Sequence, residues 1–502
     1  MAAVPVMTLA ALIAPASWWN GRAVGMGATP AAAGVGATAS GKRDAAPPAA
    51  SADTLTLVLV GDVGLNRTGT AVDARGVLEG PAPVPWSELS VKVAKVIDGD
   101  LNFMNLETVI TERNDLAPAD KGQAVSYGFR SHPAGVRQLT ELGFNLVSAA
   151  NNHAYDFGVE GVRDTVRNLS RLSAEGRLHF AGIGLNREEA GRPVELSLPA
   201  GRVAFSALGI VTNNINVHRA TADKPGTMAY RFDDDWREVV RRLGETRADY
   251  RILSVHYGEE KDVRADGRQL ADWRAAADHN GVDLIVGHHA HVVRGIEIRH
   301  GVPIFYGLGN FMLRGARDMG AVPAFAGCRD YGLLARVHLR RVAPGARLSL
   351  RAIEIVPIRD MHRQPAPFAD PIEAARRIQV VNVLSARLGA GPGTPAADAA
   401  ASLPASDAST VNALFTARPD GVGVHCVAGA GADPGVVGEL CRTWSAPPAP
   451  SAAIQAEIMH GCLRDPGLAP TGKSAAAKSA RSKARKARSK AKPASRANKH
   501  RG

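Results

Sequence analysis

The feature that most constrains this chain is a recurring pairing of short apolar segments with polar residues at their ends. Between residues 53 and 362, short β-branched runs alternate with amphipathic segments, which predicts an α/β fold. Six predicted strands run directly into Asp, Glu, Asn or His. Ligands in α/β sheets bind outside the carboxyl ends of the strands, so we expect these ends to form one site. The polar residues concerned are Asp62, Glu107, Asn152 and His153, His256, His289 and His291, and Asn310.

The expected elements follow from this alternation. Strands are predicted at 54–60, 101–106, 145–148, 202–211, 250–255, 282–286 and 303–306, with a hairpin of two strands at 333–342 and 348–356. Helices are predicted at 86–97, 133–142, 159–174, 234–246 and 268–280.

The chain divides by composition into four parts. Residues 1–52 are rich in Ala, Gly and Pro and predict a signal-like or disordered leader, whereas residues 53–362 predict the folded α/β domain. Residues 363–466 are again rich in Ala, Pro and Gly, with a few helical stretches. Residues 467–502 form a tail rich in Lys and Arg, whose few apolar residues cannot offset its chain entropy, so it is expected to be disordered.

The net charge of +12 resides in that tail. Residues 473–502 hold twelve of the 60 Lys and Arg and no acid, which leaves 48 basic residues against 48 acidic ones elsewhere. This distribution excludes the whole chain as a basic nucleic-acid-binding surface. The tail favours an anionic partner: an anionic polymer, a lipid surface or nucleic acid. A solubilising tail without a partner is the alternative.

The N-terminus and the cysteines bear on cellular location. Residues 6–14 form an apolar stretch followed by small residues, as in a signal peptide, which favours export to the periplasm or cell surface. The stretch lacks a positive start, so a disordered extension on a cytoplasmic protein stays an alternative. No internal segment is apolar enough for a transmembrane helix. Four cysteines are too few for a disulfide scaffold, although one late disulfide is compatible with export.

The residues at the strand ends are ligands for divalent metals of intermediate hardness, such as Mn, Fe and Zn. Each also has a structural explanation when taken alone: Asp62 as a cap, Glu107 as a buried ion-pair partner, His256 as a core histidine. The run His288-His289-Ala290-His291 is harder to explain in that way, because three imidazoles buried together need a metal or an acid. His289 and His291 can reach one centre only if the backbone bends there.

The ordered motifs resemble the CapA family, capsule-biosynthesis proteins linked to poly-γ-glutamate that are similar to calcineurin-like metallophosphatases. The resemblance covers about residues 54–360. The motifs are Gly61-Asp62-Val63-Gly64-Leu65-Asn66-Arg67, Asn105-Leu106-Glu107, Asn151 to Gly158, Val255-His256-Tyr257-Gly258-Glu259, Gly287 to His291, and Tyr306 to Phe311.

The resemblance implies a four-layer α/β/β/α sandwich and one or two divalent metal ions. It implies metal ligation by Asp62, Glu107, Asn152, His256, His289 and His291. It further implies that His153 is an acid oriented by Asp156, that Arg67 binds an anionic substrate group, and that Asn310 lies near the metals or the substrate.

Two departures from the metallophosphatase pattern affect the first metal position. Such proteins open with Asp-x-His, but here the third residue is Gly64, so one ligand is absent. Their second motif supplies Asp, whereas this chain has Glu107.

Three functions follow as alternatives, since a fold does not determine a reaction. The first is a CapA-type role in capsule production, with a metallophosphatase-like site that acts on or binds an anionic polymer or its phosphorylated precursor. The second is a stand-alone metal-dependent phosphoesterase with a small substrate. The third is a non-catalytic protein that binds an anionic polymer through its tail.

Overall fold

The computed structural model describes residues 52–79, 82–122, 127–210, 218–279, 281–314, 328, 330–388 and 410–463. The predicted leader and the basic tail lie outside these ranges. Within them, no helix combines the length and the apolar content that a bilayer crossing requires.

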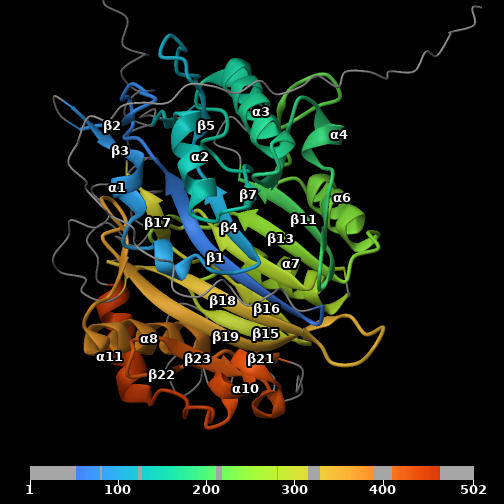
Figure 1. The fold of residues 1–502 in the computed structure, drawn as a ribbon, viewed down its shortest axis with the longest axis vertical. Helices are drawn as coiled ribbons and strands as arrows, with labels where there is room; N and C mark the ends of the chain where they lie inside the picture. Colours follow the sequence, from blue (N-terminus) through green and yellow to red (C-terminus); the bar gives the residue numbers. More distant parts are fainter. Residues whose placement is uncertain are drawn as a thin grey trace, which may run out of the picture. The chain divides into compact units, whose positions relative to one another are not determined.

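Two large mixed sheets form the centre of the fold (Figure 1). The first sheet runs in the order β22 (Thr416–Ala417), β23 (Gly423–Cys426), β19 (Leu348–Arg359), β18 (Gly332–Arg341), β1 (Thr54–Gly64), β4 (Leu101–Leu106), β7 (Leu146–Ser148) and β8 (His179–Ala181), with β17 (Asn310–Leu313) beside β1 and β20 (Ala366–Pro367) beside β19. The second sheet runs in the order β10 (Val194–Leu198), β11 (Gly201–Gly209), β13 (Tyr250–His256), β14 (Leu284–His288), β16 (Val302–Phe305), β15 (Ile296–Arg299) and β21 (Thr410–Asn412).

The strands at the centre of each sheet are parallel. Strands β17, β1, β4, β7 and β8 run in one direction in the first sheet, and β11, β13, β14 and β16 do so in the second. Smaller pairs join β2 (Gly76–Leu78) to β3 (Pro83–Pro85), β5 (Val109–Ile110) to β6 (Arg130–Ser131), and β9 (Ile183–Gly184) to β12 (Gly226–Thr227).

The helices lie outside the two sheets. Their bounds are α1 (Trp86–Ser90), α2 (Pro133–Glu141), α3 (Gly158–Ala174), α4 (Arg187–Ala190), α6 (Asp233–Gly244), α7 (Gly267–Asp278), α8 (Pro371–Ala386), α10 (Gly435–Cys441) and α11 (Ala452–Leu463), with 3-10 turns at Ala94–Val96 and Ala430–Ala432.

Alternation along the strands explains the layers. In β1, Leu57 and Leu59 point between the sheets and pack in one cluster with Phe205 and Ile252 of the second sheet. Because successive side chains of a strand point to opposite faces, Val58 of β1 faces the other way. Each central strand is therefore apolar on both faces, as strands covered on both sides require.

The outward faces of the sheets are covered by different helices. Val58 packs in a cluster with Val136 of α2 and Leu169 of α3. On the second sheet, Leu253 packs with Val239 of α6 and Trp273 of α7. Helix, sheet, sheet and helix thus form successive layers, and the predicted four-layer α/β/β/α sandwich is confirmed.

Residues after 362 complete the two sheets. Strand β23 pairs with β19, and β21 pairs with β15. Ile378 and Val381 of α8, together with Phe415, belong to the cluster between the sheets. Figure 1 shows α8, α10 and α11 gathered at one end of the fold. The division of the chain into four parts stays a prediction.

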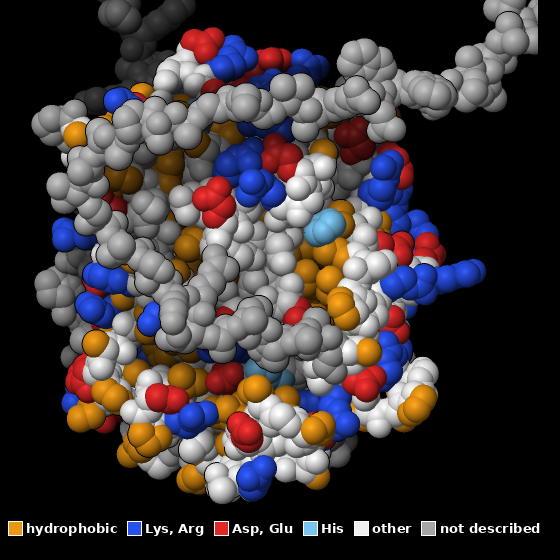
Figure 2. Space-filling view, viewed as in Figure 1, with side chains coloured by type: hydrophobic (Ala, Val, Ile, Leu, Met, Phe, Trp, Pro, Cys, Tyr) orange, Lys and Arg blue, Asp and Glu red, His pale blue; other side chains and the backbone are white. Residues whose placement is uncertain are grey.

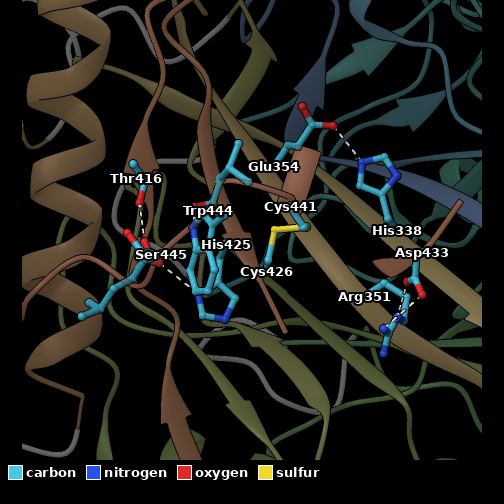
Figure 3. The surroundings of a disulfide bond; sticks show 12 residues. His338, Arg351, Glu354, Thr416, His425, Cys426, Asp433, Cys441, Trp444 and Ser445 are labelled. Carbon is cyan, nitrogen blue, oxygen red and sulfur yellow. Dashed lines mark hydrogen bonds and ion pairs between the residues drawn. A yellow bond between two sulfur atoms is a disulfide. The ribbon is translucent and has the colours of Figure 1, made fainter. Parts of the chain in front are cut away.

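Two disulfides join segments of this C-terminal region. Cys426 of β23 is bonded to Cys441 of α10, and the bond lies beside Trp444 and His425 (Figure 3). The second disulfide joins Cys328 to Cys462 of α11, across 134 residues. The chain has four cysteines, so all are paired. The sequence predicted at most one such bond.

Charged side chains of both signs occur on the described surface. Figure 2 shows acidic and basic side chains interspersed over one face. Many form ion pairs, such as Arg187 with Asp235 and Glu238. This mixture agrees with the balanced charge of the chain outside the tail.

The predicted strands and helices are present with boundaries shifted by a few residues, except for the helix at 86–97. There, α1 ends at Ser90 and a separate 3-10 turn spans Ala94–Val96. The β-branched Val91 and Val93 disfavour a helix, because their side chains lose rotamer freedom in it.

Removal of the two disulfides should destabilise the fold unequally. Chain entropy predicts about 3 kcal/mol for a closed loop of 15 residues and above 4 kcal/mol for one longer than 100 residues. The Cys328→Ala/Cys462→Ala double variant should therefore lose more unfolding free energy in urea than Cys426→Ala/Cys441→Ala. Equal losses, or the reverse order, would contradict this expectation. Double variants leave no unpaired thiol that could form a wrong bond.

Candidate metal centre

Three adjacent parallel strands of the first sheet bring polar residues into register. Asp62 at the end of β1 lies opposite Asn105 of β4 on one side and opposite Asn310 of β17 on the other. Asn105 Nδ2 donates a hydrogen bond to Asp62 Oδ1 at 2.8 Å. The Asp62 carboxylate is fully buried and held between the two neighbouring strands.

The next strand ends supply a carboxylate and an amide. Glu107 directly follows β4, and Asn151 and Asn152 lie in the turn after β7. Asn151 Nδ2 donates to the Leu106 carbonyl at 2.9 Å, which holds the turn against β4. The adjacent Asn152 places its Oδ1 atom 2.7 Å from Nε2 of His256.

The second sheet supplies the histidines. His256 and His288 are the last residues of β13 and β14 and lie in register. Beyond β14, His289 and His291 adopt φ angles of 88° and 56°. This left-handed region costs a residue with a side chain about 1 kcal/mol or more, and such strain is concentrated at functional sites. The backbone bend brings both rings to the carboxylates of the first sheet.

The side chains form two groups that share Glu107. One group is Glu107, His256 and His289, the other is Asp62, Glu107 and His291, and the ligand atoms within each lie within 4.8 Å of one another. His256 Nε2 lies 3.3 Å from Glu107 Oε1 and 3.1 Å from His289 Nδ1. His291 Nδ1 lies 3.2 Å from Asp62 Oδ2.

The Glu107 side chain tests whether a metal fits here. It is fully buried, yet neither carboxylate oxygen has a hydrogen-bond partner. Buried carboxylates are normally paired, hydrogen-bonded or bound to a metal. Oxygen and imidazole donors at these separations fit a divalent cation. The described residues could therefore hold metal ions.

The electrostatics of the cluster divide its histidines into two kinds. Burial lowers the pKa of His256 to about 3 and that of His289 well below its ordinary value, so both rings are neutral. Burial alone would also lower the pKa of His291, but Glu107 and Asp62 raise it to about 10. Burial and the charge of Asp62 raise the pKa of Glu107 to about 8. The pKa of Asp62 is held well below its usual range, because its interaction with His291 outweighs burial.

A buried polar chain lies behind His153. Its Nε2 atom is 3.9 Å from Glu107 Oε1, and its Nδ1 atom is 2.7 Å from Asp156 Oδ2. The same Asp156 oxygen accepts a hydrogen bond from the Phe129 N–H at 2.6 Å. Its other oxygen is paired with the ammonium group of Lys121, which is 2% exposed. Asp156 thus contacts His153, the Phe129 backbone and Lys121 in the protein interior.

The two predicted substrate residues lie in different surroundings. Asn310 Oδ1 is 2.8 Å from His291 Nδ1, within the cluster. Arg67 follows β1 in a loop and pairs with Glu79 at 3.3 Å, with its side chain 34% exposed. Their contacts with a substrate stay predictions, as do the individual roles of the six expected ligands.

Three residues of the site received no role from the sequence. Asn105 stands in the motif that contains Glu107, so its position next to Asp62 could have been found from strand register. His288 was counted in the histidine run, and its ring packs against Phe103. Lys121 is an isolated lysine in a loop, and nothing in the sequence around it indicates a buried ion pair.

This chain is similar to known bacterial proteins. The family model described as "Bacterial capsule synthesis protein PGA_cap" matches residues 56–314. The PGA biosynthesis protein CapA of Bacillus subtilis is 30% identical over 266 residues, which cover 52% of this chain and 62% of that protein. The capsule biosynthesis protein CapA of Bacillus anthracis is 27% identical over 332 residues, covering 64% and 71% of the two chains. This chain thus spans less than two thirds of the B. subtilis relative.

Among solved structures, a calcineurin-like phosphoesterase from Bacillus subtilis is similar to this chain, with 12% identity and a TM-score of 0.32. The similarity covers 59% of this chain and 90% of that one.

The family model covers just over half of the 502 residues, and its range includes every residue of the cluster described above. The chain therefore belongs to the bacterial capsule synthesis protein (PGA_cap) family.

Proposed function

We propose that the protein acts in poly-γ-glutamate or capsule production, through a metal-dependent, phosphoesterase-like centre that takes an anionic polymer or its phosphorylated precursor. The observation that carries the proposal is the buried cluster in which Glu107 is shared by two ligand groups. Family membership supports the pathway, since the relatives are named for PGA and capsule biosynthesis.

Two cation positions follow from the two ligand groups. One would use Glu107, Asn152, His256 and His289, and the other Asp62, Glu107 and His291. Carboxylate, amide and imidazole donors without thiolate favour Mn, Fe or Zn. Bound cations of this kind would supply Lewis acidity towards a substrate oxygen and would lower the pKa of water in the site.

His153 is proposed to protonate the leaving oxygen of the substrate. Asp156 accepts a hydrogen bond from Nδ1, which leaves Nε2 facing the cluster as the atom that would carry the transferred proton. Arg67 is proposed to bind an anionic substrate group, because its guanidinium is partly exposed and offers parallel N–H donors.

The proposed location is outside the cytoplasm. Two disulfides that pair all four cysteines are typical of proteins that fold in an oxidising compartment. There, the basic tail at 473–502 would meet an anionic polymer or an anionic lipid surface.

Metal content and turnover test the proposal together. The purified wild-type protein should contain a divalent metal by elemental analysis, and Asp62→Ala and His291→Ala should each contain less. Hydrolysis of an aryl phosphate with added Mn²⁺ should be lost in His289→Ala. His300→Ala is the matched control, because this partly exposed residue pairs with Asp278 away from the cluster. Equal metal in all proteins would contradict the metal centre. Metal binding without turnover would instead favour a polymer-binding role.

Metal binding should release protons. At pH 7 the metal-free cluster keeps protons on Glu107 and His291, since their pKa values are raised to about 8 and about 10. A cation must displace these protons, so its affinity should rise as the pH increases from 6 to 8. Calorimetry in buffers of different ionisation enthalpy should measure the release, which should fall in Glu107→Gln. An affinity that does not change with pH would contradict the expectation.

Loss of the Lys121 ammonium should affect His153 through Asp156. Lys121→Met leaves a buried carboxylate without its charged partner, which typically costs about 3–5 kcal/mol of stability. Below the melting temperature of the variant, kcat for the aryl phosphate should decrease while the metal content is retained. A variant with wild-type kcat would show that Lys121 contributes only to stability.

A further inference from the structure

The ligand group around His291 has three protein donors among the described residues, so water, substrate or a further side chain must supply the rest of its shell. Asp62, Glu107 and His291 contribute one ligand atom each. Gly64, two residues after Asp62, has no side chain to offer. Divalent metals of the kind expected here are bound by four or more donors. We therefore ask whether another side chain of this protein is a ligand at this position.

Glycines allow strand β17 to approach this position closely. A Cβ atom on Gly61 would overlap the Gly309 carbonyl oxygen, and one on Gly64 would lie 2.8 Å from a methyl carbon of Leu313. On the other side, a Cβ atom on Gly332 would overlap the Asn310 carbonyl oxygen. Backbone atoms of Gly309 and Asn310 therefore leave no room for a side chain at residues 61 and 332, so β17 lies close against β1 and β18 at these two glycines.

The register places the Asn310 side chain at the cluster. Asp62 and Asn310 are direct partners in the parallel pair, and the Asp62 N–H donates to the Gly309 carbonyl at 3.1 Å. Asn310 is 1% exposed. Asn310 therefore stands beside Asp62 at the point where β1 has no side chain at residue 64.

Three oxygen atoms converge on His291 Nδ1. Asn310 Oδ1 lies at 2.8 Å, Asp62 Oδ2 at 3.2 Å and Glu107 Oε2 at 3.9 Å. Donor atoms bound about 2.1 Å from one metal lie roughly 3–3.5 Å apart, so these spacings are close to those of a shared coordination shell. An amide oxygen is an ordinary ligand for a hard or intermediate cation.

We infer that Asn310 is a metal ligand, which completes the group of Asp62, Glu107 and His291 in place of the side chain that Gly64 lacks. This inference rests on the metal centre proposed above. It assigns to β17 the role of a ligand-bearing strand. Asn310 then belongs to the centre itself and would not be a substrate contact.

Loss of affinity alone cannot test the inference, because a residue that only orients His291 can also cost ten- to a hundredfold in metal binding. A thiolate at residue 310 can test it, since a thiolate that binds Co²⁺ produces a ligand-to-metal charge-transfer band. All four native cysteines are in disulfides, so the wild-type protein has no thiolate background. The full-length Asn310→Cys variant is loaded with Co²⁺ without oxygen or reductant.

The matched control is Ser206→Cys. Ser206 is a buried serine on β11, between Phe205, which faces the other sheet, and Ala207. Its side chain therefore points to the helix-covered face of the second sheet, away from the centre. Both variants carry one extra cysteine in a buried strand, and they differ in whether that strand position faces the cluster.

Cobalt-loaded Asn310→Cys should show the charge-transfer band, and Ser206→Cys and the wild type should not. Cobalt bound to Asn310→Cys at wild-type stoichiometry without the band would overturn the inference and leave the metal centre intact. A wild-type protein that binds no cobalt would instead contradict the metal centre itself, and the inference with it.

Asn310→Asp keeps the test decisive if the cysteine variant does not fold. A carboxylate of the same size in the coordination shell should tighten cobalt binding by about tenfold, since affinity increases with ligand charge. Unchanged or weaker cobalt binding in Asn310→Asp would overturn the inference.

Discussion

The buried carboxylate of Glu107 is the group on which the centre depends. It is inaccessible to solvent, lacks hydrogen-bond partners and lies between the two ligand groups. In the metal-free protein the charged form of Glu107 is unfavourable, and the pKa of this carboxyl is therefore raised. A cation on each side would remove that penalty. Metal binding would relieve the free-energy cost of burying the Glu107 carboxylate, and this relief would contribute to metal affinity.

Close approach of the two sheets makes this arrangement possible. Glu107 and Asp62 come from the first sheet, and His256, His289 and His291 from the second. Neither sheet alone carries a complete ligand group, so the centre exists only when the apolar faces between the sheets are packed. The positive φ angles at His289 and His291 are compatible with this packing and would be costly in a free chain.

Much of the fold could be predicted from the sequence, because strands buried on both faces are apolar and β-branched and their ends are polar. The positions of Asp62 and His256 follow from that pattern. An ion pair between distant loops leaves no periodic pattern in the sequence. The Lys121–Asp156 pair could therefore not be predicted. The strands after residue 362 were also missed, since β21 and β23 are only three and four residues long.

The neutrality of the chain outside the tail restricts how an anionic polymer could be recognised. Interspersed charges of both signs offset one another, and physiological salt screens exposed charges beyond about 8 Å, so the face in Figure 2 exerts little long-range attraction. Attraction at a distance would then depend on the basic tail, which carries the whole net charge. Selection at short range would depend on the bound cations of the centre and on Arg67 in the loop after β1. Capture and chemistry would thus be separate properties of separate segments, and deletion of the tail should weaken the first without altering the second.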